Sequence, residues 1–383
     1  MREAAEAASS ASSADADLAG SADSRLTVAV IGVGLIGGSI SLAARERLGA
    51  EVVGYDSSPP ALAAALERGA LTRTAASIAE AVQGCEVVFV AVPVGRLTEA
   101  VRAALAAAPR DCVVSDVGST KRAVVAAHDD PRFVGGHPLA GAETSGVEHA
   151  RADLFDGATW YLTPAATTSG MGYERLYRLL RQLGARPTAI DPDTHDTILA
   201  TVSHLPHVVA NVLVSQAAHA LCAQDERLPA TGPSFRDATR VAGASSAIWT
   251  DIYLSNRVAL AAQIAEAIGR LATVRDALLA GDETAVTAWN DAAAADRRRL
   301  LEAQLAGGPL VELRASVPNR PGVIAQLALE LGRSGVNITD MALYPAPDMS
   351  EGVVALWIAG EEEALKAQEL VRRLGFPVTG GSA

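Results

Sequence analysis

The sequence predicts a doubly wound α/β sheet, followed by an all-α region and a small α+β unit of β-α-β-β-α order. Three observations support this fold class. Short apolar runs rich in β-branched residues alternate with Ala-rich helical stretches in the first half, long helical periodicity follows, and strand-like runs return near the C-terminus. A chain of 383 residues is long enough for two or three domains.

The first half contains seven strand-like runs. Their apolar residues are consecutive and do not alternate with polar ones, which is typical of parallel strands covered by helices on both faces. The five main runs span 26–32, 51–56, 86–93, 111–118 and 132–138, and the runs at 159–164 and 186–192 extend the same sheet.

The second part, from about residue 172, is helical and weakly polar. Helices this apolar are seldom exposed on a monomer, so we expect one face to be buried against a second copy in a homodimer. From about Gly307 the chain changes to LVELRASVP, a turn, a helix, two strands and a final helix.

Composition excludes several classes of protein. The net charge is −12 and no Lys/Arg cluster is present, which argues against a nucleic-acid partner. Three widely spaced cysteines without a CxxC motif predict neither disulfides nor a zinc site and suit the cytoplasm. We expect no signal peptide and no membrane span, because no apolar run approaches roughly 18 residues.

The stretch VAVIGVGLIGGSI places Gly32, Gly34 and Gly37 in GxGxxG spacing between a strand and a helix. In a dinucleotide site of the Rossmann type these glycines permit the turn, the approach of the pyrophosphate and close helix packing. A simple Gly-rich turn is the alternative. We expect the cofactor to contact the following residues: Gly32, Gly34, Leu35, Ile36, Gly37, Asp56, Val92 and Pro93.

Asp56 ends the second strand, 19 residues after Gly37. A carboxylate about 20 residues beyond the glycines binds the adenosine ribose and repels a 2′-phosphate, so the sequence favours NAD over NADP. The alternative for Asp56 is a helix N-cap.

The sheet's carboxyl edge is expected to hold the chemistry, because crevices at this edge bind ligands. His137, in GGHPLAG, can act there as a base near neutral pH or can be a packed structural histidine. Ser119 and Lys121 lie at an expected helix start and can serve as caps. Gly135 and Gly136 are expected to let cofactor and substrate approach.

Several stretches, in this order, resemble the prephenate dehydrogenase family of tyrosine biosynthesis over residues 26–305. They are GVGLIGGS, DVGSTK, FVGGHPLAGAETSGVEHA, TWYLTP, VSHLPH and FRDATRVAGASSAIWTDIYLSN. The resemblance implies NAD-dependent oxidative decarboxylation of prephenate to 4-hydroxyphenylpyruvate and CO2, without a metal.

The resemblance also implies site residues. His137 would take the proton of the ring hydroxyl and Ser119 would share that hydroxyl. Glu143 would gate entry. Substrate contacts would come from Ser203, His207, Arg240 and Trp249. Residue types alone leave other interpretations open: packed or metal-binding histidines at 204 and 207, a solvated Arg236 and Arg240 beside Asp237, and a core role for Trp249.

The C-terminal stretches VPNRPGVIAQL and SGVNIT are similar to an ACT domain, a regulatory amino-acid-binding module. The resemblance implies feedback by tyrosine at the loops that hold Asn319, Pro321, Gly322, Asn337 and Ile338. An oligomerisation module without a ligand is the alternative.

These features predict a disordered tail (1–24), an NAD-binding domain (25–171), a helical dimerisation and substrate domain (172–305) and an ACT-like domain (306–383). Three other functions stay open. An arogenate dehydrogenase differs little in sequence. A β-hydroxyacid dehydrogenase would use a lysine in the helical domain, where residues 172–304 contain none. A non-catalytic regulator that senses NAD and an amino acid would need a DNA-binding element, and none is visible.

Overall fold

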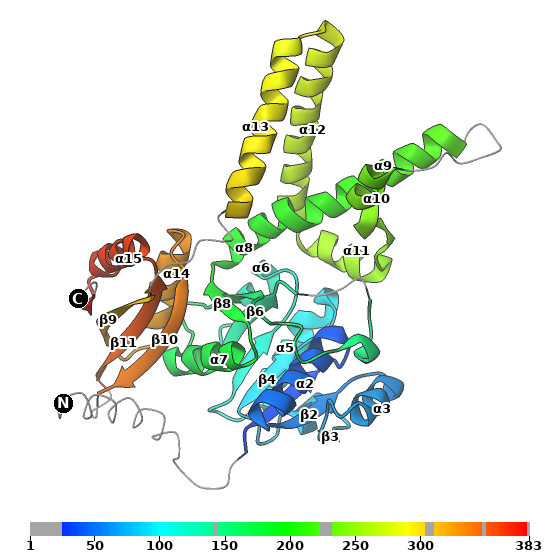
Figure 1. Cartoon of the computed structure of the whole chain (residues 1–383). Coiled ribbons are helices and arrows are strands. Elements are labelled where there is room, and N and C mark those ends of the chain that lie inside the picture. The colour runs from blue at the N-terminus through cyan, green and yellow to red at the C-terminus, as the bar shows by residue number, and fades with distance from the viewer. Residues whose placement is uncertain (1–24, 141–143, 223–231, 303–309, 347–349, 381–383) are drawn as a thin grey trace, which may run out of the picture.

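The computed structural model of the chain describes residues 25–140, 144–222, 232–302, 310–346 and 350–380. An eight-stranded sheet with helices on both faces forms the body. Long helices project from it, and a four-stranded sheet with two helices lies at its side (Figure 1). The tail expected at residues 1–24 lies outside the described residues.

The large sheet has the strand order β3-β2-β1-β4-β5-β6-β7-β8. The order reverses between β1 and β4, which places a ligand crevice at the carboxyl ends of these two strands. Its strands are β1 (Thr27–Ile31), β2 (Glu51–Tyr55), β3 (Arg73–Thr74), β4 (Val87–Val90), β5 (Val113–Asp116), β6 (Phe133–Pro138), β7 (Thr159–Thr163) and β8 (Arg186–Ala189).

All seven expected strands form, and two details differ from the expectation. The sequence pattern missed β3, which has only two residues. The expected parallel sheet is interrupted because β7 pairs antiparallel to β6. Among the described residues of the connection from 139 to 158, the one helix is the short 3₁₀ helix η1 (Val147–His149), and β7 starts from the edge of the sheet at which β6 ends.

Helices cover both faces of this sheet. One face packs on α2, α3 and α7, and the other packs on α4, α5 and α6. Their bounds are α2 (Leu35–Leu48), α3 (Pro59–Glu67), α4 (Ile78–Ala81), α5 (Val94–Ala107), α6 (Arg122–Ala126) and α7 (Gly170–Gln182). Both α7 and β8 belong to the sheet layer, although most of α7 and all of β8 lie beyond residue 171, where we placed the end of the first domain.

The helical part begins with one long helix that contains a π turn. Pro206 lacks an N–H group and cannot complete the regular ladder, and the π turn lies directly before it. The elements are α8 (Pro192–Leu199), η2 (Ala200–His204), α9 (Leu205–Cys222), α10 (Pro233–Thr239), η3 (Arg240–Gly243), α11 (Ser246–Ser255), α12 (Arg257–Ala280) and α13 (Glu283–Glu302).

The segment Pro192–Ala220 bears on the expectation of no membrane span, which rests on uninterrupted apolar runs. An 18-residue stretch within it has a mean hydropathy of 1.5, and the helix's length and composition would allow it to cross a membrane. Counting uninterrupted apolar runs missed it because a few polar residues divide it. A core or interface helix meets the same criteria, and this helix carries the buried polar side chains of His195, Asp196 and His204.

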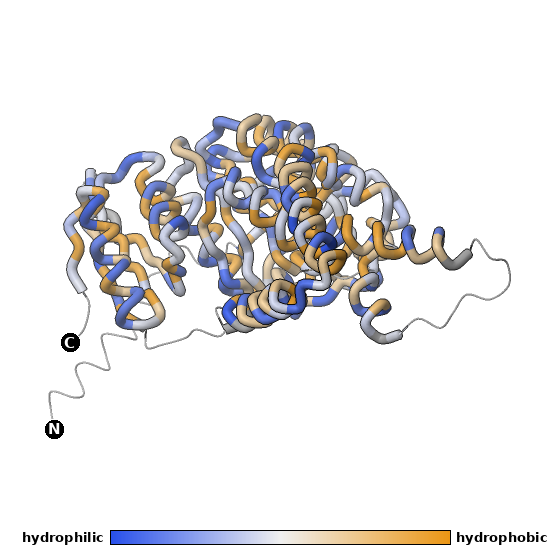
Figure 2. Tube along the Cα trace, turned by 90° about the horizontal axis from the view of Figure 1, so that it is seen from above, coloured by the Kyte–Doolittle hydropathy of each residue, from blue (hydrophilic) through white to orange (hydrophobic). Residues whose placement is uncertain are grey.

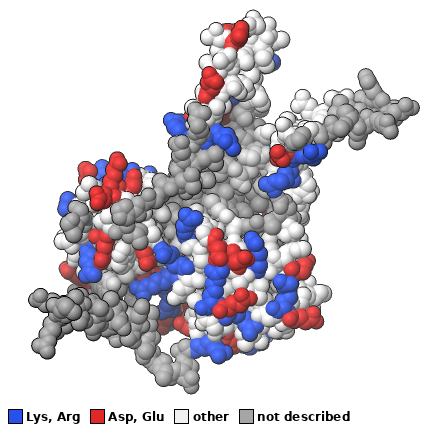
Figure 3. Space-filling view, viewed as in Figure 1, with Lys and Arg blue, Asp and Glu red and all other residues white. Residues whose placement is uncertain are grey.

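The helices α12 and α13 form an arm that projects from the body (Figure 1). On the face shown in Figure 3 this arm is mostly uncharged. Hydrophobic residues also follow α9 where it extends away from the body (Figure 2). Val258, Leu271 and Leu279 are 71%, 67% and 81% exposed, so the arm presents apolar surface to its surroundings.

The C-terminal unit is an antiparallel sheet of order β10-β11-β9-β12 with two helices. The sequence pattern missed β12, which pairs with β9 and completes a β-α-β-β-α-β unit. The elements are β9 (Leu310–Pro318), α14 (Val323–Arg333), β10 (Ile338–Pro345), β11 (Glu351–Ala359), α15 (Glu361–Arg373) and β12 (Val378–Gly380).

The C-terminal unit is docked on the large sheet and shares its hydrophobic core. The Tyr177 hydroxyl of α7 donates to the Ile338 carbonyl at 3.0 Å. The Gly322 N–H donates to the Thr168 carbonyl, also at 3.0 Å. A Cβ atom at Gly322 would collide with the Ala166 carbonyl, so only glycine allows this approach.

Candidate active site

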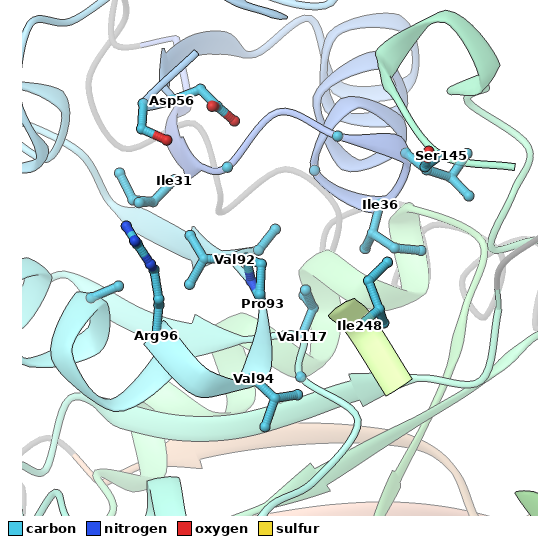
Figure 4. A pocket seen from close by; sticks show the side chains of 18 of the residues that line it. Ile31, Ile36, Asp56, Val92, Pro93, Val94, Arg96, Val117, Ser145 and Ile248 are labelled. Carbon is cyan, nitrogen blue, oxygen red and sulfur yellow. The ribbon is translucent and has the colours of Figure 1, made fainter. Parts of the chain in front are cut away.

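A pocket of about 860 Å³ opens at the crevice between β1 and β4 (Figure 4). All eight residues expected to contact the cofactor line it, together with Ser119. The glycine loop after β1 forms one wall, and residues 91–94 after β4 form the opposite wall. The strand order therefore places these separate motifs around one cavity.

The glycine loop has the geometry that a pyrophosphate requires. Gly32 has φ +93°, and a Cβ atom there would collide with the Ala91 carbonyl. A Cβ atom at Gly37 would collide with the Gly32 carbonyl, so this position allows α2 to pack closely. No atom lies within 4 Å of a Cβ built at Gly34, which leaves the loop open toward the pocket. The N-terminus of α2 adds a partial positive charge.

Asp56 holds this loop in place. Its two carboxylate oxygens accept hydrogen bonds from the Val33 N–H at 2.9 Å and the Ser58 N–H at 2.8 Å. The N-cap of α3 is Ser58, whose side chain accepts from the Ala61 N–H, so Asp56 is not the cap. It lines the pocket with its second-strand neighbour Tyr55.

Arg96 is a pocket residue that sequence reasoning missed. It lies in the first turn of α5 and points toward the end of the pocket that holds Asp56 and Ile31 (Figure 4). No Arg or Lys follows Asp56 directly in the sequence, whereas the fold brings Arg96 to it from 40 positions further along the chain.

The helical part closes the pocket from above. Ile248 and Ile252 of α11 line the cavity. Between them, the Asp251 carboxylate accepts from the Gly95 N–H of α5 at 3.2 Å. Ser255 and Thr120 hydroxyls lie 2.8 Å apart. These contacts fix α11 over the nucleotide crevice.

His137 is the last residue but one of β6, is 8% exposed and makes a side-chain contact with a second histidine. Its Nδ1 lies 2.9 Å from Nε2 of His195, and Nδ1 of His195 lies 2.8 Å from Oδ1 of Asp196. Burial, followed by the nearby His195 and Lys121, lowers the pKa of His137 well below its usual value. A neutral imidazole can accept a proton, so His137 suits the role of a base.

Lys121 and Asp116 form a fully buried ion pair beneath His137. Lys121 donates to the Gly136 carbonyl at 2.6 Å, and Asp116 accepts from the Gly136 N–H at 3.1 Å. The side chain of Lys121 therefore clamps the strand and is not a helix cap. Gly136, like Gly135, is buried, and a Cβ at either would collide with neighbouring strands, which corrects their expected role toward ligands.

Ser119 lines the pocket and does not cap α6. The cap comes from Asp196 on α8, which accepts from the N–H groups of Lys121 at 2.8 Å and Arg122 at 3.0 Å. Ser119 is thus left at the pocket wall, on the loop that follows β5.

The histidines of SHLPH have different surroundings. Nδ1 of His204 lies 3.2 Å from Nδ2 of Asn256. His207 is stacked on Trp249 at a centroid distance of 3.6 Å and contacts the Tyr253 hydroxyl. Within the described ranges no cluster of three or more potential metal ligands forms, and these two histidines contact protein groups.

The remaining expected substrate residues lie on the helical part or outside the described residues. Ser203 is half-buried in the π turn η2, and Arg240 is exposed at the start of η3. Neither lines the nucleotide pocket. Glu143 lies outside the described residues.

Comparisons with known proteins agree with this geometry. Residues 40–189 match the nucleotide-binding domain of prephenate dehydrogenase, and residues 191–289 match its dimerization domain. The prephenate dehydrogenase of Bacillus subtilis is 32% identical over 355 residues, which cover 90% of this chain and 95% of that protein. The chain belongs to the prephenate dehydrogenase family.

Two further relatives support this assignment. The cyclohexadienyl dehydrogenase of Zymomonas mobilis is 32% identical over 67% of this chain and 89% of its own length. The crystal structure of the A. aeolicus prephenate dehydrogenase with hydroxyphenyl propionate and NAD⁺ is 28% identical, has a TM-score of 0.69 and covers 73% of this chain and all of that one. The chain is thus an oxidoreductase with NAD as its cofactor, and its pocket and glycine loop fit the dinucleotide.

We predict that Asp56→Asn shifts this prephenate dehydrogenase family member from NAD toward NADP. The change removes the charge that repels a 2′-phosphate and leaves Arg96 in the same pocket to attract it. The ratio of kcat/KM for NAD to that for NADP should fall by about 10- to 100-fold. Ser57→Ala, an uncharged change in the same pocket, is the control. An unchanged ratio in Asp56→Asn would contradict the role of the carboxylate.

Proposed function

We propose that the protein catalyses the oxidative decarboxylation of prephenate to 4-hydroxyphenylpyruvate and CO2 with NAD. The single observation that carries this proposal is His137, a neutral buried histidine at the carboxyl edge of the nucleotide-binding sheet, bound through Nδ1 to His195. Its other ring nitrogen is then available for a substrate hydroxyl. Membership of the prephenate dehydrogenase family supports the choice of substrate.

His137 takes the proton of the ring hydroxyl as that oxygen becomes a carbonyl. Bound NAD supplies the hydride acceptor for the same carbon. The ring carboxylate leaves as CO2, its bonding electrons enter the ring, and the ring becomes aromatic as the carbonyl oxygen takes a proton back from His137 to form the phenol. Ser119, at the pocket wall, holds the hydroxyl that His137 deprotonates.

We assign the substrate's other groups to the helical part. The stacked rings of His207 and Trp249 offer a flat surface and a polar edge for the side chain of the substrate. Arg240 binds a carboxylate with its planar fork, Ser203 contributes a hydroxyl, and Glu143 gates entry. His207 packs on Trp249 and contacts the Tyr253 hydroxyl, and we assign it the contact with the keto group of prephenate.

The assay that tests the proposal combines NAD or NADP with prephenate or arogenate and follows reduced nicotinamide by absorbance. We expect turnover with NAD and prephenate. His137→Asn should lower kcat by about 100- to 10,000-fold with little change in KM, because the base acts in the transition state. His149→Asn, which changes an exposed histidine, should leave kcat unchanged. No turnover with any pair would exclude the proposed activity, and a preference for arogenate would exclude the substrate.

The pH profile of the same assay follows from the lowered pKa of His137. A protonated His137 cannot accept a proton, so kcat/KM falls as the pH decreases through its pKa in the free enzyme. Since that pKa is depressed, the acid limb should lie below the usual value of about 6.5. An acid limb above pH 6.5 would show that another group controls the rate.

We propose a homodimer formed through the helical part. The apolar residues exposed on α9 and on the α12–α13 arm support it, because such surface is normally covered by a partner. The match of residues 191–289 to the family's dimerization domain agrees with this arrangement. A solution mass of one chain, 39.3 kDa, would contradict it. We place the dimer in the cytoplasm, where its free thiols Cys85 and Cys112 stay reduced.

We propose that the C-terminal unit is an ACT-like regulatory domain that responds to tyrosine. Its β-α-β-β-α-β order and its docking on α7 support a unit that can influence the sheet. Asn319 and Pro321 are exposed, whereas Gly322 and Ile338 bond to the nucleotide-binding domain. The side-chain oxygens of Asn337 and Thr188 lie 3.3 Å apart.

Asn319 also lines a pocket of about 40 Å³ beside the start of α7. This volume is too small for an amino acid, so binding would need a second surface, such as a paired unit of another chain.

A point variant of the full chain tests this regulation. Deleting residues 306–383 would expose the shared core, so we choose Asn319→Ala instead. The tyrosine concentration that gives half inhibition should rise by about tenfold, as the loss of one hydrogen bond predicts. Gln326→Ala, an exposed amide on α14, is the control. Equal inhibition of both variants and the parent, competitive with prephenate, would place the inhibitor in the active site.

A further inference from the structure

We propose that His195 and Asp196 are positioning residues that fix the tautomer of His137, so that its Nε2 is the basic atom. This inference rests on the proposed role of His137 as the base. Sequence reasoning did not select either residue. Both lie on α8, the first helix after the sheet, and both are fully buried.

The first step is the charge state of Asp196. Burial alone would raise its pKa, but hydrogen bonds from His195 and from two backbone N–H groups outweigh burial and lower it. The oxygen Oδ1 accepts from the Lys121 N–H at 2.8 Å, and Oδ2 accepts from the Arg122 N–H at 3.0 Å. An ionised carboxylate only accepts hydrogen bonds. The proton between Asp196 and His195 therefore belongs to Nδ1 of His195.

The second step derives the tautomer of His137 from that of His195. A neutral His195 with its proton on Nδ1 has a lone pair on Nε2. Nδ1 of His137 lies 2.9 Å from that lone pair and must donate to it. The single proton of neutral His137 is then on Nδ1, and its Nε2 is left as an acceptor. If the carboxyl group of Asp196 carried the proton instead, His195 and His137 would each carry their proton on Nε2.

The third step concerns the charge that forms during the reaction. His137 gains a positive charge when it takes the substrate proton, in a buried place where a charge is costly. Lys121 and Asp116 already neutralise each other. Asp196 is then the carboxylate of this group whose negative charge no cation balances. His195 lies between it and the new positive charge on His137. His204, the other titratable group near His137, is held neutral because burial lowers its pKa to about 4.

The fourth step concerns orientation. The ring of Tyr161 on β7 stands edge-on to His195, with centroids 5.6 Å apart and planes at 89°. Asn256, at the start of α12, donates to the Asp196 carbonyl at 2.7 Å. The sheet thus packs on the His195 ring, and the helical part anchors the backbone of Asp196, which together fix His195 in its place beside His137.

The experiment compares two variants of the full-length chain. His195→Phe keeps a ring but removes the acceptor, whereas His195→Gln keeps an acceptor. We expect His195→Phe to lower kcat about 100-fold with KM changed less than about threefold, and His195→Gln to recover most of that loss. His128→Phe is the matched control, since His128 is also buried but bonds only to the Val124 and Thr98 carbonyls. Its kcat should not change.

Nitrogen NMR of ¹⁵N-histidine-labelled protein without cofactor gives a readout independent of turnover, with His137→Asn assigning the signal. We expect the neutral His137 ring to carry its proton on Nδ1, and Asp196→Asn to move that proton to Nε2. A proton on Nε2 of His137 in the parent chain would overturn the inference. A folded His195→Phe with the parental kcat would also overturn it, as would a His195→Gln whose kcat is no higher than that of His195→Phe. If the parent lacks turnover, the function fails while the NMR result still decides the tautomer.

Discussion

The hydrogen bond between Nδ1 of His137 and Nε2 of His195 joins the two halves of the candidate active site. His137 lies at the end of a strand of the sheet, and His195 lies on α8, where the helical part begins. For this bond to form, β6 must keep its position in the sheet and α8 must pack across the end of the sheet. The Asp116–Lys121 pair meets the first requirement by clamping Gly136. Asp196 meets the second by capping α6.

The same packing gives the pocket its upper wall. Once α8 is fixed, the long helix leads the chain away from the sheet and the later helices return to it. The contacts of α11 with α5 then place Ile248 and Ile252 over the crevice. The glycine loop and Asp56 depend on local sequence, whereas this wall depends on residues far away in the chain. A buried row of polar groups therefore also sets the shape of an apolar nucleotide pocket.

Local patterns predicted the sheet well, and the reasons for the failures are physical. Strands such as β1 and β4 are apolar throughout and bounded by loops, whereas β3 and β12, with two and three residues, are too short to produce a pattern. The orientation of β7 could not be read from its residues, because direction depends on the connection that precedes it. Motif spacing located the cofactor loop for the opposite reason: the function of GxGxxG lies in consecutive backbone geometry.

The missed site residues show what spacing cannot reveal. Arg96, His195 and Asp251 belong to ordinary helical sequence, and each acquires its place only when strand order or domain packing brings it to the site. The pair His195 and Asp196 carries no local signal, since it stands in a run of polar residues at 193–197 and only the packing of α8 buries it. Burying both costs free energy unless each is bonded. In this fold the bonds go to His137 and to the start of α6, and they offset that cost beside the histidine that we propose as the base.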